Sequence, residues 1–181
     1  MKASLSVASI TDIINRLDAF KSNLDIANEN VISTLINKGT TQAELYNARA
    51  PQSGLEKSKI IGKITEHGKS GYIALVGDNA VYDEFGTGEE GAADAHPLKG
   101  EFGLNPYNSG PYVSTHVNVL TGRHYWIIPP GQYTPGTYVD ERGYTEGIPS
   151  GKQMYDTSRY IRFIKDSVIE KEFNNAIKKY K

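Results

Sequence analysis

Apolar residues recur at intervals of three, four or seven from about Val7 to Asn37, and this spacing predicts one face of a long α-helix close to a heptad repeat. The face consists of Val7, Ile10, Ile14, Leu17, Leu24, Val31 and Leu35. Gly39 is a stop signal after this pattern, and residues 41–48 predict a further turn or two of helix. Such a first helix would be about 40–45 Å long. Because Lys21 and Asn28 interrupt the repeat, packing on a sheet is favoured over a free coiled coil.

A second helical pattern runs from about Thr157 to Tyr180. Its apolar face contains Ile161, Ile164, Val168, Phe173, Ala176, Ile177 and Tyr180, and its polar face carries Arg159, Arg162, Lys165, Glu170, Lys171 and Lys178. This separation of faces predicts an amphipathic helix that packs on the rest of the protein.

Between the helices, alternation of apolar and polar residues predicts a β-hairpin. Its strands are Lys59 to Glu66 and Tyr72 to Val76, joined by a turn at 67–71 that contains two glycines. The expected order of elements is helix, antiparallel strands, a long insertion, a strand and a helix. This order predicts an α+β fold in which both helices pack on a small antiparallel sheet, as one domain over residues 1–181.

A short helical turn is expected at Ala80 to Phe85, with Asp78 or Asn79 as its N-cap. Gly86 can close the turn with a left-handed conformation, because it has no Cβ atom. The pattern predicts that Tyr82 and Phe85 face a core. It also predicts that the carboxylates of Asp83 and Glu84 stay near the surface.

The segment from about Glu89 to Arg142 predicts an irregular arm rich in proline, glycine and tyrosine. Its aromatic content is too high for a disordered linker. Two strands are expected within it, Tyr112 to Leu120 and His124 to Ile128, with Trp126 as an apolar anchor. Insertions of this length in compact proteins are usually functional or ordered by a partner.

Charge and composition exclude several classes of protein. The formal net charge is -1, from 20 basic and 21 acidic residues, which is not the basic excess of a protein held mainly by nucleic-acid phosphates. Cysteine is absent, so disulfides and thiolate metal sites are excluded. No signal-peptide core or membrane-spanning apolar run is found, so a soluble protein made in the cytoplasm is expected.

The sequence carries no recognised catalytic, cofactor or metal motif. Asp83 and Glu84 are adjacent, so their side chains would point about 100° apart on a helix and would not form a facing acid/base pair. The four histidines lack a metal-ligand spacing and are expected to be ordinary surface residues, although His116 and His124 can approach each other across a hairpin. Gly86-Thr-Gly88 lacks the pattern of a phosphate-binding loop.

Three segments, in this order, resemble a family signature. Ala50-Pro-Gln-Ser-Gly-Leu-Glu-Lys-Ser58 comes first, and Tyr82-Asp-Glu-Phe-Gly-Thr-Gly88 follows after the hairpin. Gly143-Tyr-Thr-Glu-Gly-Ile-Pro-Ser-Gly-Lys-Gln-Met-Tyr155 precedes the last helix. Together they are similar to the neck proteins of long-tailed double-stranded DNA phages, the head–tail joining and tail-completion proteins. The chain departs from the family pattern at Gln52 and Gln153 and in the length of its arm.

The resemblance implies a structural protein of the virion neck, made in the host cytoplasm, rather than an enzyme. It would form a homo-oligomeric ring between a portal, connector or head-closure protein and a tail terminator or tail tube protein, with only incidental contact to DNA and none to membrane. The expected interface residues are Tyr82, Glu84, Phe85, Gly86, Thr87, Gly88, Trp126, Tyr133 and Tyr138. Two alternatives remain open at this point. One is a carboxylate-dependent glycan hydrolase or lyase that uses Glu84 with a second carboxylate such as Glu101 or Asp140, and the other is a monomeric binding module whose tyrosine-rich arm recognises a peptide or glycan.

Overall fold

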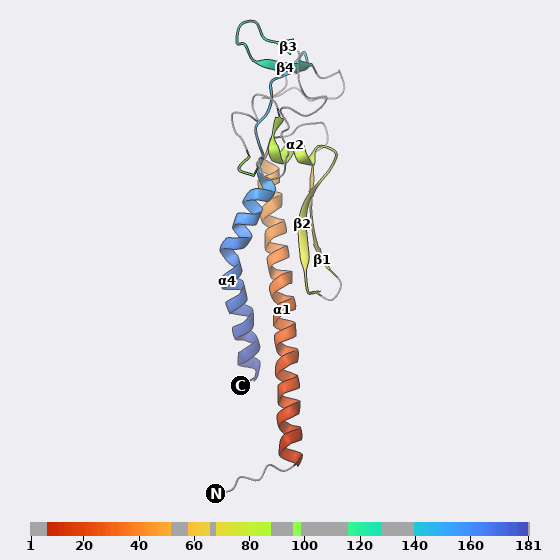
Figure 1. Cartoon of the computed structure of the whole chain (residues 1–181), viewed down its shortest axis with the longest axis vertical. Helices are drawn as coiled ribbons and strands as arrows, with labels where there is room; N and C mark the ends of the chain where they lie inside the picture. The colour runs from red at the N-terminus through yellow and green to blue at the C-terminus, as the bar shows by residue number, and fades with distance from the viewer. Residues whose placement is uncertain are drawn as a thin grey trace. The chain divides into compact units, whose positions relative to one another are not determined.

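The computed structural model describes residues 7–51, 58–65, 68–87, 96–98, 116–127 and 140–180. The fold is α+β, with a long N-terminal helix, a C-terminal helix and a small antiparallel β-sheet, as the sequence predicts. Figure 1 traces the chain from the N-terminal helix α1 to the C-terminal helix α4.

Helix α1 is one continuous helix over Val7–Arg49, about 64 Å long, so the expected stop at Gly39 is wrong. A glycine inside a helix costs only about 1 kcal/mol relative to alanine. The turns after Gly39 bury Ala43 and Asn47, and this packing offsets that cost. The helical pattern at 41–48 is therefore the end of α1 rather than a separate element.

The predicted hairpin is confirmed. Strands β1 (Lys59–Ile64) and β2 (Gly71–Val76) form a two-stranded sheet. The turn between them is closed by Thr65, whose backbone N–H and hydroxyl both donate to the carbonyl of Ser70 at 2.8 and 2.9 Å.

The chain divides into two compact units. The first contains the described residues of Met1–Lys38, Gly62–Tyr72 and Ile161–Lys181. Its buried apolar residues are Ala27, Val31, Val168 and Ala176, from the two helices. The hairpin lies directly against α1, because a Cβ atom on Gly71 would come within 2.7 Å of the Ile36 side chain.

The second unit contains the described residues of Gly39–Ile61 and Ile73–Tyr160, including the short helix α2 (Ala80–Phe85). Its three-stranded sheet has the order β3-β4-β5, from His116–Val117, His124–Ile127 and Tyr144–Thr145. The antiparallel register pairs His116 with Tyr125 and Trp126 with Thr145. Strands β3 and β4 lie within the two segments predicted for the arm.

Strand β5 and strand β6 (Gly147–Ile148) lie between the predicted arm and the last helix, where the expected order has one strand, and their bounds were not predicted because two residues are too few to show a period. Ile148 bridges to Thr87, and its N–H also donates to the Thr87 hydroxyl at 3.2 Å. The chain therefore leaves α2 and returns to β6 at neighbouring positions. The ends of the predicted arm are held together by this pairing.

Candidate functional site

Most of the buried side chains in the described part of the second unit are polar. Its described residues include two buried apolar side chains, Ala43 and Ile148. Eight buried polar residues form what we call the polar core: Asn47, Ser58, Asp83, Glu84, His96, Ser150, Gln153 and Thr157. Buried polar groups persist only where hydrogen bonds replace the lost water, so the polar core is the feature of this unit that needs explaining.

The predicted surface position of Asp83 and Glu84 is wrong. They are 2% and 6% exposed, whereas Tyr82 and Phe85 are only half-buried. The physical reason is that both carboxylates have hydrogen-bond donors from distant parts of the chain, which an apolar-periodicity argument does not detect.

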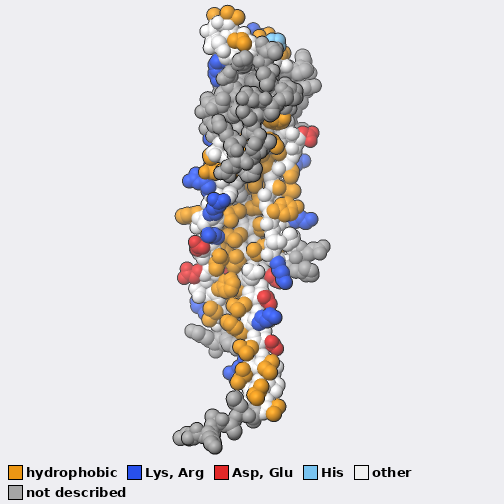
Figure 2. Space-filling view, viewed as in Figure 1, with side chains coloured by type: hydrophobic (Ala, Val, Ile, Leu, Met, Phe, Trp, Pro, Cys, Tyr) orange, Lys and Arg blue, Asp and Glu red, His pale blue; other side chains and the backbone are white. Residues whose placement is uncertain are grey.

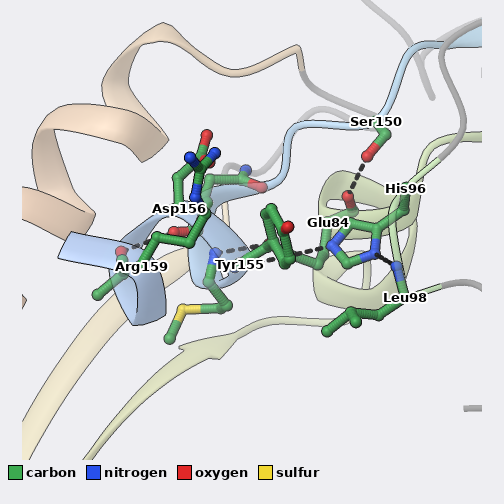
Figure 3. A network of polar contacts seen from close by, with 10 residues as sticks. Glu84, His96, Leu98, Ser150, Tyr155, Asp156 and Arg159 are labelled. Atoms are coloured by element: carbon green, nitrogen blue, oxygen red, sulfur yellow. Dashed lines mark hydrogen bonds and ion pairs between the residues drawn. The ribbon is translucent and has the colours of Figure 1, made fainter. Parts of the chain in front are cut away.

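Glu84 caps the N-terminus of helix α4 (Gln153–Tyr180) from another element of the fold. Its Oε2 accepts the N–H of Met154 at 2.8 Å, and its Oε1 accepts the N–H of Tyr155 at 3.0 Å (Figure 3). The first N–H groups of a helix have no partner within the helix, and the macrodipole there favours a negative charge. The carboxylate of Glu84 satisfies both requirements. This cap explains why α4 begins at Gln153, before the predicted start at Thr157.

The capping is reciprocal, because the segment before α4 binds the last carbonyl groups of α2. The N–H of Gly151 donates to the Asp83 carbonyl at 2.9 Å, and the N–H of Lys152 donates to the Glu84 carbonyl at 3.1 Å. The Ser150 hydroxyl also donates to the Glu84 carbonyl, at 2.8 Å (Figure 3). The end of α2 and the start of α4 thus satisfy each other's unpaired backbone groups.

Gly86 makes this close approach possible. Its φ of 76° confirms the expected positive φ, but its ψ of 175° places it in an extended region open essentially to glycine alone, not in the left-handed helical region. A Cβ atom here would lie 2.7 Å from the N atom of Ser150 and 2.8 Å from the O atom of Ile148. Both the backbone conformation and the available space therefore require glycine.

Asp83 connects α2 to the end of α1. Its carboxylate accepts a hydrogen bond from the Ser58 hydroxyl, and the Ser58 carbonyl accepts one from the Asn47 side chain at 2.7 Å. Asn47 in turn accepts a longer hydrogen bond, 3.4 Å, from the Gln153 amide at the start of α4. Through these bonds, four segments that are distant in sequence meet in one buried network.

His96 is a third residue of the polar core whose expected surface position is wrong. Its Nδ1 accepts the N–H of Leu98 at 3.0 Å, so Nε2 carries the ring proton and donates it to Glu84 Oε1, also at 3.0 Å (Figure 3). The ring lies 4.3 Å from the Phe85 ring and 5.4 Å from the Tyr155 ring, measured between centroids. A lone histidine in a long insertion gave no sequence signal for this position.

The other predicted interface residues are only partly brought together. Tyr82, Glu84, Phe85, Gly86 and Thr87 are contiguous at the end of α2. Trp126 lies in β4, opposite Thr145. Gly88, Tyr133 and Tyr138 lie outside the described residues.

The hydrogen bonds of the polar core hold together the end of α1, helix α2 and the start of α4. Both oxygens of Glu84 are occupied by hydrogen bonds, and the side chains of Glu84 and His96 are 9% and 2% exposed. Among the described residues, no three histidine, cysteine or acidic side chains are grouped so that they could hold a metal ion. His116, one of the two histidines considered for such a site, stacks on Tyr125 at 5.4 Å.

Asp140 closes the turn before β5. Its Oδ1 accepts the N–H groups of Tyr144 and Arg142, both at 2.9 Å. The Tyr144 hydrogen bond first, and then the amide and guanidinium of Arg142, hold the pKa of Asp140 below its ordinary value, although partial desolvation opposes them. The lowered pKa means that the folded turn favours the ionised carboxylate.

We therefore expect the stabilisation from Asp140 to be complete above the ordinary aspartate pKa and to be lost as pH falls through the lowered value of the folded state. The amide proton shift of Tyr144, followed by NMR between about pH 7 and pH 2, should move with this titration. In Asp140→Asn the pH-dependent movement should disappear. An unchanged titration of the Tyr144 amide in that variant would contradict the assignment.

No protein-family model matches the chain, and no curated protein or solved structure is significantly similar to it. No helix within the described ranges is both long and apolar enough to cross a membrane.

Proposed function

We propose that the protein is a structural subunit of the neck of a long-tailed phage, where a ring of copies joins the portal or connector to the tail. The observation that carries the proposal is that the Tyr82–Thr87 segment is used as a buried contact between α2, the start of α4 and Ser58. Both carboxylates of that segment are buried and hydrogen-bonded within the fold, because Glu84 caps α4 and Asp83 accepts from Ser58. This use supports an assembly role over the glycan hydrolase or lyase, which would need a carboxylate that substrate can reach.

Exposed apolar residues support the part of the proposal that concerns protein partners. The turn between β3 and β4 presents Val119 and Leu120 at 96% and 95% exposure. The turn is held by backbone hydrogen bonds from Asn118 to Arg123 and from Gly122 to Asn118, at 2.9 and 2.7 Å. These two adjacent aliphatic side chains form a small exposed apolar surface that is available to a partner protein.

The proposed neighbours are other copies of the chain, a portal, connector or head-closure protein, and a tail terminator or tail tube protein. The balanced charge supports no more than incidental contact with DNA in the channel. The proposed location is the neck of the virion, after synthesis in the host cytoplasm.

Native mass spectrometry of the full chain, together with electron microscopy of virions carrying labelled protein, tests this function. We expect closed rings at micromolar concentration, or rings that form on addition of the neck partners, and label at the junction of head and tail. A protein that stays monomeric with those partners and is absent from particles would refute the proposal. Hydrolysis of a glycan by the purified protein would favour the enzymatic alternative.

The Val119 and Leu120 contact gives a separate prediction. Replacing both by serine should leave thermal stability nearly unchanged, because exposed substitutions usually alter stability by no more than about 0.5 kcal/mol. Incorporation of the protein into particles should fall at least about tenfold, which corresponds to about 1.4 kcal/mol of lost binding. Thr121→Ser at the same turn is the matched control. Normal incorporation of the double variant would show that this turn is not a contact.

A further inference from the structure

The N-terminal end of α1 carries an apolar face that its own unit leaves uncovered. We call it the α1 stripe, and it consists of Val7, Ile10, Ile13, Ile14 and Leu17, which are 82, 45, 48, 53 and 59% exposed. Figure 2 shows hydrophobic side chains gathered along this end of the long helix. A contiguous apolar stripe, on the order of a few hundred Å2, usually marks a surface that a partner buries.

The same heptad positions are covered further along the helix. Leu24 and Leu35 are half-buried and Val31 is 5% exposed. Lys21, the first interruption of the repeat, falls where the seam changes from exposed to covered. The helix therefore has one continuous seam, of which its own unit covers only the second part.

The composition of the stripe indicates what covers it. With Val7 at heptad position a, Ile10 and Leu17 occupy d, Ile14 occupies a, and Ile13 occupies g. Apolar residues at a, d and g make a face too broad for a two-stranded seam, and this width is typical of helices in a bundle. The surface that covers the stripe is therefore expected to be the apolar face of other helices.

The positions beside the stripe are compatible with a parallel arrangement of identical helices. Asp12 and Arg16 lie at positions f and c, on the side away from the stripe, where they pair with each other at 2.9 Å. In a parallel bundle a g position faces an e position of the neighbour, so Ile13 would lie beside Asp18 of the next copy. An antiparallel order sets e against e and brings Asp18 opposite the neutral Thr11 of the neighbour, so the parallel order rests on the common direction of all copies in a ring.

The length of the stripe indicates that it does not hold copies together alone. Two heptads are too short for a stable isolated helix pair, and the area is below the roughly 1,200 Å2 of a stable interface. In a closed ring each copy meets a neighbour on both sides, and all copies point the same way along the axis. A short parallel contact between stripes suits such a ring, because it repeats between every pair of neighbours and needs all copies to point the same way.

We infer that the α1 stripe binds the α1 stripes of neighbouring copies, parallel and in register, as a bundle of helices. This inference rests on the ring proposed above, and it names the surface through which that ring is partly formed.

The absence of cysteine from the chain allows a direct test in the full-length protein. Ile14→Cys places a thiol in the stripe, and Ala19→Cys places one at position f, on the opposite side of the same exposed helix end. In a parallel bundle the Ile14→Cys thiols come close enough for a disulfide. We expect Ile14→Cys to form disulfide-linked dimers at least tenfold faster than Ala19→Cys under the same mild oxidant. The oligomeric state of both variants is measured in parallel by native mass spectrometry.

A second pair of variants tests the contact without cross-linking. Ile14→Lys should weaken self-association at least tenfold, whereas Asn15→Lys adds the same charge at the adjacent exposed position and should change it less than twofold. Far-ultraviolet circular dichroism should show equal helix content in both.

The outcomes separate the inference from the proposed function. Rings with fast cross-linking at Ile14→Cys support both. Rings in which Ile14→Cys cross-links no faster than Ala19→Cys overturn the stripe contact and leave the ring intact. Fast, selective cross-linking in a protein that forms only dimers supports contact between stripes and overturns the ring. A monomer without selective cross-linking overturns both.

Discussion

Replacing Glu84 by glutamine is expected to lower the free energy of unfolding by about 3 kcal/mol. The carboxylate accepts three hydrogen bonds, from the N–H groups of Met154 and Tyr155 and from His96. An amide has one acceptor oxygen, so its NH2 group must face at least one of these donors. A buried donor left unpaired costs about 1–3 kcal/mol, and the lost charge at the helix N-terminus adds up to about 2 kcal/mol.

Urea denaturation followed by circular dichroism measures this change. Glu44→Gln is the matched control, because it makes the same substitution at an exposed position of α1 and should stay within about 0.5 kcal/mol of the parent. The amide resonances of Met154 and Tyr155 should shift in Glu84→Gln and not in Glu44→Gln. Equal stability of the two variants would show that the Glu84 cap contributes nothing to the fold.

A side chain at position 86 is expected to have a comparable or larger effect. Gly86→Ala places a Cβ atom 2.7 Å from the Ser150 N atom and forces an L-residue into a conformation that is essentially restricted to glycine. Because the atoms in conflict are backbone, they cannot move aside as the end of a flexible side chain would. We expect a loss of about 3–4 kcal/mol, and more for Gly86→Val, whose branched side chain adds to the overlap.

Gly122→Ala separates the cost of the steric overlap from the cost of the backbone conformation. Gly122 also has a positive φ, 70°, but a Cβ atom there meets nothing within 4 Å. This control should therefore lose only the conformational cost of about 1–2 kcal/mol. A Gly86→Ala variant no less stable than Gly122→Ala would contradict the close packing of α2 against the segment before α4.

Local patterns were sufficient for the elements that are long or strongly periodic. Heptad spacing predicted a long N-terminal helix with its apolar pattern from about Val7, and alternation predicted the hairpin of β1 and β2. The stop at Gly39 was wrong, because packing of Ala43 and Asn47 outweighs the weak helix preference of one glycine. The expectation of a special glycine at position 86 was confirmed for φ, since only glycine combines that φ with so little space.

The buried contact between α2 and the start of α4 could not be predicted from local sequence patterns. Adjacent acidic residues on a short turn are usually solvated, so Asp83 and Glu84 were expected near the surface. Their burial depends on donors at Ser58, Met154 and Tyr155, which come from two other segments of the chain. No periodicity in a single sequence encodes such pairings.

The sequence alone determined the α+β order of elements, the long amphipathic helix, the absence of cysteine chemistry and the need for glycine after α2, because each depends on residues close together in the chain. Only the tertiary structure decided that the carboxylates of α2 face inward and that His96 belongs to the interior. It also decided that the first heptads of α1 remain uncovered. The physical reason is that burial and hydrogen bonding depend on which distant segments meet in space, and two carboxylates take the interior only where donors from those segments replace water.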